Sequence, residues 1–220
     1  IVSVPSVGST FADLPGVPDT ARYIWVVNDF LVIGHLGSYP RRVQWSSNIS
    51  SEQWTPGERG SSFQDLSTGD EIMGGLGSER GGVILQRSGM HLMSPIVDAT
   101  AGFRVDPLNE ARGVIAPQSI VQFGQGLFAY LSEDGFFVGA EGRAIGDELV
   151  DRWFLNDEID REYLPEVKGQ VDPYNKIIWW QYRRLDGTKA MIGWNWTLQR
   201  WTFSNQNVAQ IAAMATPAIT

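Results

Sequence analysis

Residues 176–196 read KIIWWQYRRLDGTKAMIGWNW, with two apolar and aromatic runs on either side of a polar segment. The pair Asp186-Gly187 in that segment favours a tight turn, because glycine adopts positive φ without strain. Alternate side chains of a β-strand share one face, so each run places several large apolar groups on one side. At least one of these faces must be buried against another sheet, because so much apolar surface is costly to leave in water. The segment predicts a β-hairpin within a packed β structure.

The same order of strand, turn and strand recurs along the chain. Three further hairpins are predicted, and they pair residues 23–27 with 30–36 across Asn28-Asp29, 83–87 with 90–93 across Ser88-Gly89, and 127–131 with 136–139 across Asp134-Gly135. A turn at Leu198-Gln199 leads into a last run at 200–203. The best helical candidate is 147–160, which has apolar residues spaced for one face. Counting all runs gives about fourteen strands of about five residues, which indicates an all-β fold.

The grouping of these strands favours β-propeller-like blades. A blade has four strands, so about fourteen strands make roughly three to four blades. Three possibilities follow: an incomplete propeller, blades completed elsewhere in a longer chain, or a β-sandwich. We predict an extended N-terminal arm at 1–20, a β-propeller-like domain at 21–210 and a C-terminal tail at 211–220. The arm is rich in proline and apolar residues without periodicity, so we expect it to lie against another surface.

Composition excludes several classes of function. The 17 Lys+Arg and 25 Asp+Glu residues give a formal net charge of −8. This balance disfavours a nucleic-acid clamp, because phosphate binding relies on basic patches. The lack of cysteine (Cys 0) removes disulfides, thiol catalysis and Cys-based zinc sites. No apolar run approaches the length of a membrane span, about 18 residues, so we expect no span.

The two histidines, His35 and His91, are the first candidates for chemistry. A zinc site would need both of them and a carboxylate, since the chain offers no thiolate. Each histidine occurs in an apolar strand next to a turn. We therefore interpret both as strand residues with a polar tip at the surface.

Carboxylates are the second group of candidates. The densest acidic cluster comprises Asp157, Glu158, Asp160, Glu162 and Glu166. Clustered carboxylates can bind calcium, but this spacing does not match the usual calcium loop, and basic residues are interleaved. We interpret the cluster as a solvated, salt-bridged connector.

Glycosidic chemistry needs two carboxylates at a fixed separation, one with a raised pKa. Asp134 and Asp172 precede Gly135 and Pro173, which is typical of turn formers. The glycine-rich stretch at 74–77 lacks the Gly-Lys-Ser/Thr ending of a phosphate loop, and we interpret it as a plain loop. We therefore predict no catalytic, cofactor-binding or metal-binding residues and no hydrolase activity. Substitution of Asp134, Glu162 or Asp172 would be the test of that expectation.

Tryptophan is the most unusual feature of the composition. The nine tryptophans are Trp25, Trp45, Trp54, Trp153, Trp179, Trp180, Trp194, Trp196 and Trp201. Aromatic platforms bind sugars and interface partners, but we interpret most of these rings as core between sheets. Trp54 lies beside Thr55-Pro56-Gly57, which predicts a loop. We therefore expect Trp194→Ala to destabilise the protein far more than Trp54→Ala.

Two stretches resemble the blades of bacteriophage tail proteins. Residues 171–182 and 192–202, VDPYNKIIWWQY and IGWNWTLQRWT, resemble one such blade. Residues 30–35 and 41–46, FLVIGH and RRVQWS, with Trp54, resemble the start of another, in which an aliphatic strand precedes an R-V-x-W-S strand. Residues 65–69 and 83–93 continue that order. The family is the tail nozzle, or tail hub, of short-tailed double-stranded DNA phages, and the resemblance covers about 23–204.

The resemblance implies a structural virion protein that is not an enzyme. Family members form a homo-oligomeric ring, commonly of six subunits, below the portal and adaptor proteins, and fibres or spikes are further partners. The implied location is the phage tail, after synthesis in the bacterial cytoplasm. Genomic DNA would pass through without specific binding, and an acidic lumen suits this because carboxylates repel phosphates. The alternative is a β-propeller glycosidase or carbohydrate-binding module that uses a tryptophan face.

The arm at 1–20 gives a further expectation for assembly. We expect it to dock on a neighbouring subunit or tail protein. Its deletion should then leave the β domain folded and impair ring or tail assembly.

Overall fold

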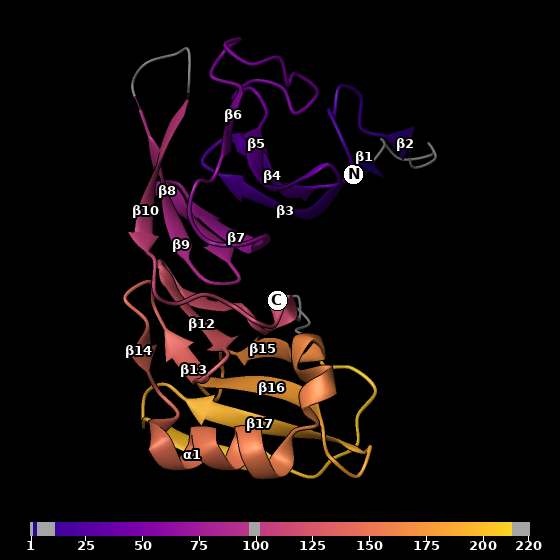
Figure 1. Ribbon diagram of the computed structural model, residues 1–220, viewed down its shortest axis with the longest axis vertical. Helices are drawn as coiled ribbons and strands as arrows, with labels where there is room; N and C mark the ends of the chain where they lie inside the picture. Colours follow the sequence, from indigo (N-terminus) through magenta and orange to yellow (C-terminus); the bar gives the residue numbers. More distant parts are fainter. Residues whose placement is uncertain (1, 4–11, 97–101, 213–220) are drawn as a thin grey trace, which may run out of the picture. The chain divides into compact units, whose positions relative to one another are not determined.

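The computed structural model describes residues 2–3, 12–96 and 102–212. Over these residues the chain is all-β, with four antiparallel sheets of four strands each and a small two-stranded pair (Figure 1). The chain divides into two compact units, Ile1–Gly113 (unit 1) and Val114–Thr220 (unit 2). The predicted domain at 21–210 includes parts of both units. Residues 1, 4–11 and 213–220 of the predicted arm and tail lie outside the described residues.

Unit 1 contains two sheets whose strands follow one another in sequence order. The strands of the first sheet are β3 (Ala21–Val27), β4 (Phe30–Leu36), β5 (Tyr39–Trp45) and β6 (Ser62–Asp65). Those of the second are β7 (Ile72–Ser78), β8 (Gly81–Gln86), β9 (Met90–Pro95) and β10 (Phe103–Asn109). The predicted hairpins at 23–36 and 83–93 are confirmed, with Val27 opposite Phe30 and Leu85 opposite Met90. The short strands β1 (Val2–Ser3) and β2 (Ala12–Asp13) form the separate pair.

The glycine-rich stretch at 74–77 is part of strand β7, so its interpretation as a loop is wrong. The first strands of the two sheets, β3 and β7, pack together. A Cβ atom on Gly75 would overlap the indole of Trp25, and one on Gly77 would overlap the carbonyl oxygen of Val26. These glycines therefore allow the two strands to approach closely. Propensity alone disfavours glycine in a strand, but close packing of a neighbouring backbone reverses that preference here.

Unit 2 repeats the plan of two sheets in sequence order. Its first sheet contains β11 (Val121–Gly124), β12 (Leu127–Ser132), β13 (Gly135–Val138) and β14 (Arg143–Ala144). Its second contains β15 (Lys168–Asp172), β16 (Ile177–Arg183), β17 (Lys189–Asn195) and β18 (Arg200–Ser204). The predicted hairpins at 127–139 and 176–196 are confirmed, as is the turn before 200–203. The first strands again contact each other, β11 against β15.

Among its described residues, unit 2 also contains four short helices, of which the first precedes β11 and the other three connect its two sheets. They are η1 (Pro117–Ser119), α1 (Asp147–Trp153), η2 (Phe154–Glu158, a π-helical turn) and η3 (Arg161–Glu166). The predicted helix at 147–160 is confirmed over α1 and η2. Acidic residues in the first turn of α1 and Arg152 in its last turn suit the helix dipole. Asp151 also accepts a hydrogen bond from the backbone N–H of Phe136 on β13, at 3.1 Å, which ties α1 to the sheet.

The core of unit 2 contains the inward face of the hairpin at 176–196. Ile178, Trp180 and Tyr182 are buried on β16, as are Ile192 and Trp194 on β17, so the expected burial of this face is confirmed. The Trp180 ring centroid lies 4.7 Å from that of Phe136 and 5.9 Å from that of Trp201. Its Nε1–H donates to the carbonyl oxygen of Ser119 at 2.9 Å. A buried tryptophan needs such an acceptor, and here the bond ties β16 to helix η1.

Trp54 lies in the long connection between β5 and β6, as predicted, but its ring is buried. Its exposed fraction is 4%, against 3% for Trp194. The connection folds back over the outward face of the first sheet, where Trp54 packs with Ile33 and Leu36. Its Nε1–H donates to Ser51 within the same connection, at 2.7 Å. A local pattern of turn residues predicts irregular backbone, but it carries no information about what the side chain covers.

The last residues of the predicted arm belong to the packing of unit 1. Val17 packs against the cluster around Trp54. The backbone N–H of Gly37 donates to the carbonyl oxygen of Thr20 at 2.9 Å. The side chain of Asp19 accepts from the backbone N–H of Ser38 at 3.3 Å. Residues 16–20 therefore support the sheet of unit 1.

Candidate functional site

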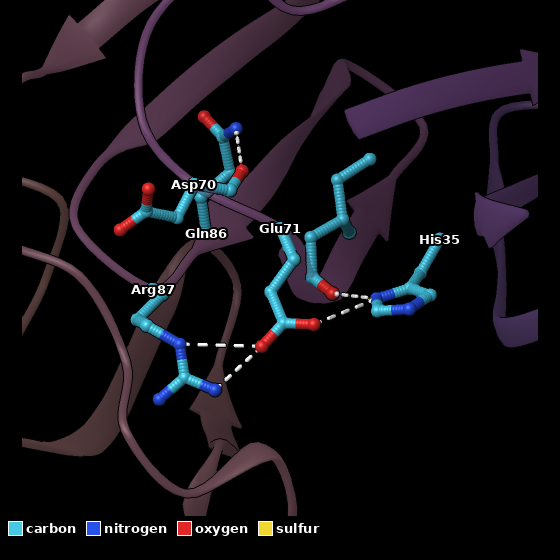
Figure 2. Close-up of polar contacts among 6 residues, drawn as sticks. His35, Asp70, Glu71, Gln86 and Arg87 are labelled. Carbon is cyan, nitrogen blue, oxygen red and sulfur yellow. Dashed lines mark hydrogen bonds and ion pairs between the residues drawn. The ribbon is translucent and has the colours of Figure 1, made fainter. Parts of the chain in front are cut away.

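A polar cluster in unit 1 joins the two sheets around His35, Glu71 and Arg87 (Figure 2). His35 lies on β4 at an irregularity in the pairing with β5, between Gly34 and Leu36, and its φ is 57°. Glu71 immediately precedes β7, and Arg87 immediately follows β8. The bulge turns the imidazole toward the second sheet, where it contacts the start of β7.

The hydrogen bonds of the cluster assign a tautomer to His35. Its Nδ1 lies 3.0 Å from the carbonyl oxygen of Ile72 and 3.6 Å from Oε2 of Glu71. A carbonyl oxygen accepts only, so Nδ1 carries a proton and donates to it. The ring of Tyr23 stands edge-on to the imidazole, with centroids 6.0 Å apart. Burial raises the pKa of Tyr23, so its phenol is neutral at pH 7.

Glu71 carries the negative charge of the cluster. Its Oε1 accepts from Nε of Arg87 at 3.2 Å and from Nη2 at 2.5 Å (Figure 2). The backbones of the same two residues are also hydrogen-bonded: the N–H of Arg87 donates to the carbonyl oxygen of Glu71 at 3.1 Å. The hydrogen bonds from Arg87 hold the pKa of Glu71 below its usual range, and partial burial opposes this. The carboxylate is therefore ionised at neutral pH.

An oriented histidine beside a carboxylate could serve as a general base. Catalysis would also need a nucleophile or a substrate within reach of Nε2. Among the residues that the structure describes, Nε2 has no hydrogen-bond partner that could take that role. The contacts that are present join β4 to β7 and β7 to β8. The cluster is best described as a polar clamp between two sheets.

His91 lies apart from this clamp, on β9, and its expected surface position is wrong. Its exposed fraction is 2%, and burial lowers its pKa, so the imidazole is neutral at pH 7. Nε2 lies 3.3 Å from Oγ1 of Thr68, whereas Nδ1 has no hydrogen-bond partner among the described residues. Over those residues, no group of three His, Asp or Glu side chains could hold a metal ion, so the two histidines form no zinc site there.

The acidic cluster in unit 2 is only partly solvated. Glu158 is buried, and its carboxylate accepts from the hydroxyl of Tyr182 at 2.9 Å and from Nε of Arg184 at 2.6 Å. Burial, followed by the hydrogen bond to Glu158, raises the pKa of Tyr182 strongly. Asp160 instead caps helix η3 by accepting from the backbone N–H of Glu162 at 3.1 Å. The exposed members, Asp157, Glu162 and Glu166, fit the solvated part of the predicted connector, whereas the ion pair with Arg184 is made by the buried Glu158.

The three carboxylates considered for hydrolysis lie on different elements. Asp134 is in the turn between β12 and β13, Glu162 is exposed on η3, and Asp172 ends β15. Asp172 accepts from the backbone N–H groups of Tyr174 and Asn175 and from Nδ2 of Asn175. These bonds lower its pKa, with the Asn175 side chain as the largest cause. Asp172 is a turn former, as expected, and an ionised carboxylate cannot act as a general acid at neutral pH.

Comparison with known proteins gives no family for this chain. No protein-family model matches it, and no curated protein matches it. Among the described residues, no helix is both long enough and apolar enough to cross a membrane.

Proposed function

We propose that the protein is a structural virion protein, a subunit of an oligomeric tail nozzle or hub ring of a short-tailed phage. In this proposal the ring links the portal and adaptor region to the distal tail and lines the path by which DNA leaves. Its partners are further copies of the chain, commonly six in a ring, and neighbouring tail proteins such as fibres or spikes. No enzymatic step is assigned to it.

The observation that carries the proposal is the repeated sheet plan. Each of the four sheets has its strands in strict sequence order, as the blade of a propeller does. In unit 1 the first strands β3 and β7 pack together, and in unit 2 the first strands β11 and β15 do the same. Contact between the first strands of two consecutive sheets is typical of adjacent propeller blades. This supports propeller-like blades over a sandwich, and it agrees with the resemblance of 171–202 to a phage tail blade.

Exposed apolar residues on β3 support self-association. Ile24 and Val26 alternate on the face opposite Trp25, and their exposed fractions are 51% and 57%. The same strand buries Trp25 and Val27 on its other face. Apolar strand residues left in water are typical of surfaces that an assembly covers. The net charge of −8 suits a channel through which DNA passes without binding.

The test is the oligomeric state of the purified full chain. We expect light scattering after size exclusion to give a multiple of the 24.4 kDa subunit, and negative-stain images to show rings. Val26→Glu should shift the population toward monomer, because it places a charge on the exposed face of β3. Leu149→Glu is the matched control, since Leu149 is an exposed apolar residue on α1. A monomer at all concentrations up to about 100 µM, well above the Kd of a stable ring, would contradict the proposal.

A further inference from the structure

A row of four residues crosses the outward face of the second sheet in unit 2. Trp179 on β16 pairs with Gln170 on β15 and with Gly193 on β17, and Gly193 pairs with Thr202 on β18. A Cβ atom on Gly193 would lie 2.8 Å from Cε3 and Cζ3 of Trp179. The indole therefore occupies the space over the glycine. The row forms an aromatic platform with an amide at one end.

The chain after β18 returns over the same face and forms a second wall. The side chain of Gln181 donates to the carbonyl oxygen of Val208, and Nζ of Lys189 donates to that of Ala209 at 3.0 Å. The backbone N–H of Lys189 donates to Oδ1 of Asn207 at 3.3 Å. Three separate bonds thus hold 207–209 against β16 and β17. The residues that follow, 210–212, line the open space in front of the platform.

The space between the platform and this segment is a pocket of about 490 Å³. Trp179, Met191, Gln170 and Asp172 line it from the sheet, and Gln210 lines it from the returning segment. The volume lies within the range of small-molecule sites, about 300–1,000 Å³. The lining combines one aromatic ring, two amides and one carboxylate with five other apolar residues: Val171, Pro173, Met191, Ile211 and Ala212.

This lining selects the chemistry of a ligand. Amides donate to and accept from hydroxyl groups, an ionised carboxylate accepts from them, and an indole stacks against the apolar face of a sugar ring. The ionised Asp172 disfavours anions, and the nearby cation Lys189 is engaged with Ala209. We propose that the pocket binds a hexose unit of a neutral glycan. The site is complete within unit 2, so this inference does not depend on ring assembly.

The same lining indicates binding without hydrolysis. Both glycosidase mechanisms need two carboxyl groups, one of them protonated. Asp172 is the one carboxylate among the residues that line the pocket, and its pKa is lowered. Bound oligosaccharides should therefore stay intact.

The experiment titrates the full chain with maltotriose and with cellotriose, using calorimetry and saturation-transfer NMR. We expect at least one trisaccharide to bind and to show saturation transfer to its ring protons. Trp179→Ala should weaken binding roughly tenfold, because it removes the stacking surface. Trp153→Ala is the matched control: Trp153 is a partly exposed tryptophan of the same unit, on α1, and its loss should leave affinity unchanged.

Two further variants separate binding from folding. Trp179→Phe keeps an aromatic face and should retain affinity within about threefold, whereas Gln170→Ala should weaken binding by about threefold or more. Thermal melts and far-UV circular dichroism check that each variant is folded. The proposal is overturned if neither trisaccharide binds at about 10 mM, a weak-binding limit. It is equally overturned if folded Trp179→Ala binds like the Trp153→Ala control, or if the trisaccharides are hydrolysed.

Discussion

Units 1 and 2 share a sheet plan but fill the space between their sheets in different ways. Where β3 meets β7, unit 1 sets one large ring, Trp25, against the glycines of β7, so the backbones approach closely. Farther from these first strands, Phe30 and Trp45 contact Phe103 across the two sheets of unit 1. Unit 2 sets rings against rings, with Phe136, Trp180 and Trp201 in mutual contact. The same topology therefore tolerates two kinds of interface. The side-chain volumes on the facing strands decide how close the sheets lie, and the strand order does not.

The comparison also shows how each interface can fail. A ring-on-ring core is damaged when a ring is removed, because a cavity remains. A ring-on-glycine interface is damaged when an atom is added, because the backbone cannot move aside. Hydrogen exchange with mass spectrometry can assign each loss to peptides of unit 1 or unit 2, which a single melting curve cannot do.

The largest expected effect is the loss of the central ring in unit 2. Trp180→Ala should destabilise unit 2 by about 3–5 kcal/mol, because it leaves a large cavity and removes the donor to Ser119. Urea unfolding and hydrogen exchange measure the loss. Trp153→Ala, at an exposed fraction of 36%, should cost much less. Comparable losses for the two variants would show that Trp180 is not central to the packing.

Because Trp54 is buried, Trp194→Ala is no longer expected to destabilise the protein far more than Trp54→Ala. Both rings are buried, so Trp54→Ala and Trp194→Ala should each cost about 3 kcal/mol or more. The losses should fall in different units: unit 1 for Trp54 and unit 2 for Trp194. A melt of Trp54→Ala that matches the wild type would contradict the packing of the connection on the first sheet.

The next largest loss of stability should come from Gly77→Ala, which adds one methyl group. The loss should be confined to unit 1. Gly77→Ala would place its Cβ atom against the carbonyl oxygen of Val26, which is backbone and cannot rotate away. The expected cost is about 1–3 kcal/mol. Gly124→Ala on β11 is the matched control, because its nearest neighbour is the flexible side chain of Leu127 at 3.2 Å. If the amides of β3 and β7 exchange hydrogen equally slowly in Gly77→Ala and Gly124→Ala, close approach of these strands is contradicted.

Breaking the polar clamp at Glu71 should lower the stability of unit 1 by a smaller amount, and this loss should depend on pH. Glu71→Gln removes the ion pair with Arg87, and a half-exposed pair of this kind contributes about 0.5–1 kcal/mol. Because the folded-state pKa is lowered, this stability is fully present above the unfolded pKa and is lost as pH falls through the folded pKa. The variant and the wild type should therefore differ in urea unfolding at about pH 6 and converge as the pH falls below the ordinary titration range of a glutamate. Glu79→Gln, in the exposed turn after β7, should show no such convergence.

The smallest effect on stability is expected from removing residues 1–13. This truncation leaves Val17, Asp19 and Thr20 in place, so thermal melts of unit 1 should change little. Ring assembly should be impaired if the arm docks on a neighbouring subunit. Deletion of 1–20 would also remove packing around Trp54, so it should lower the melting temperature as well. Rings of normal size from the shorter truncation would contradict docking by the arm.

The sequence by itself determined the all-β class, the four hairpins and the helical segment near 147–160. Each of these depends on local information. Alternating apolar residues define a strand, and pairs such as Asn28-Asp29 and Asp186-Gly187 define the turn that closes it. The turn role of Asp172 was also local, since its partners are Tyr174 and Asn175.

The tertiary structure alone decided what each side chain faces. Gly75 and Gly77 lie in a strand, where Trp25 and Val26, about fifty residues earlier in the sequence, leave no room for a side chain. Trp54 and His91 are buried because distant segments cover them. Trp179 and Trp180 are adjacent in sequence, yet one lines a pocket and the other fills a core. Strand alternation requires them to face opposite ways, but only the packing of the sheets decides which face is covered.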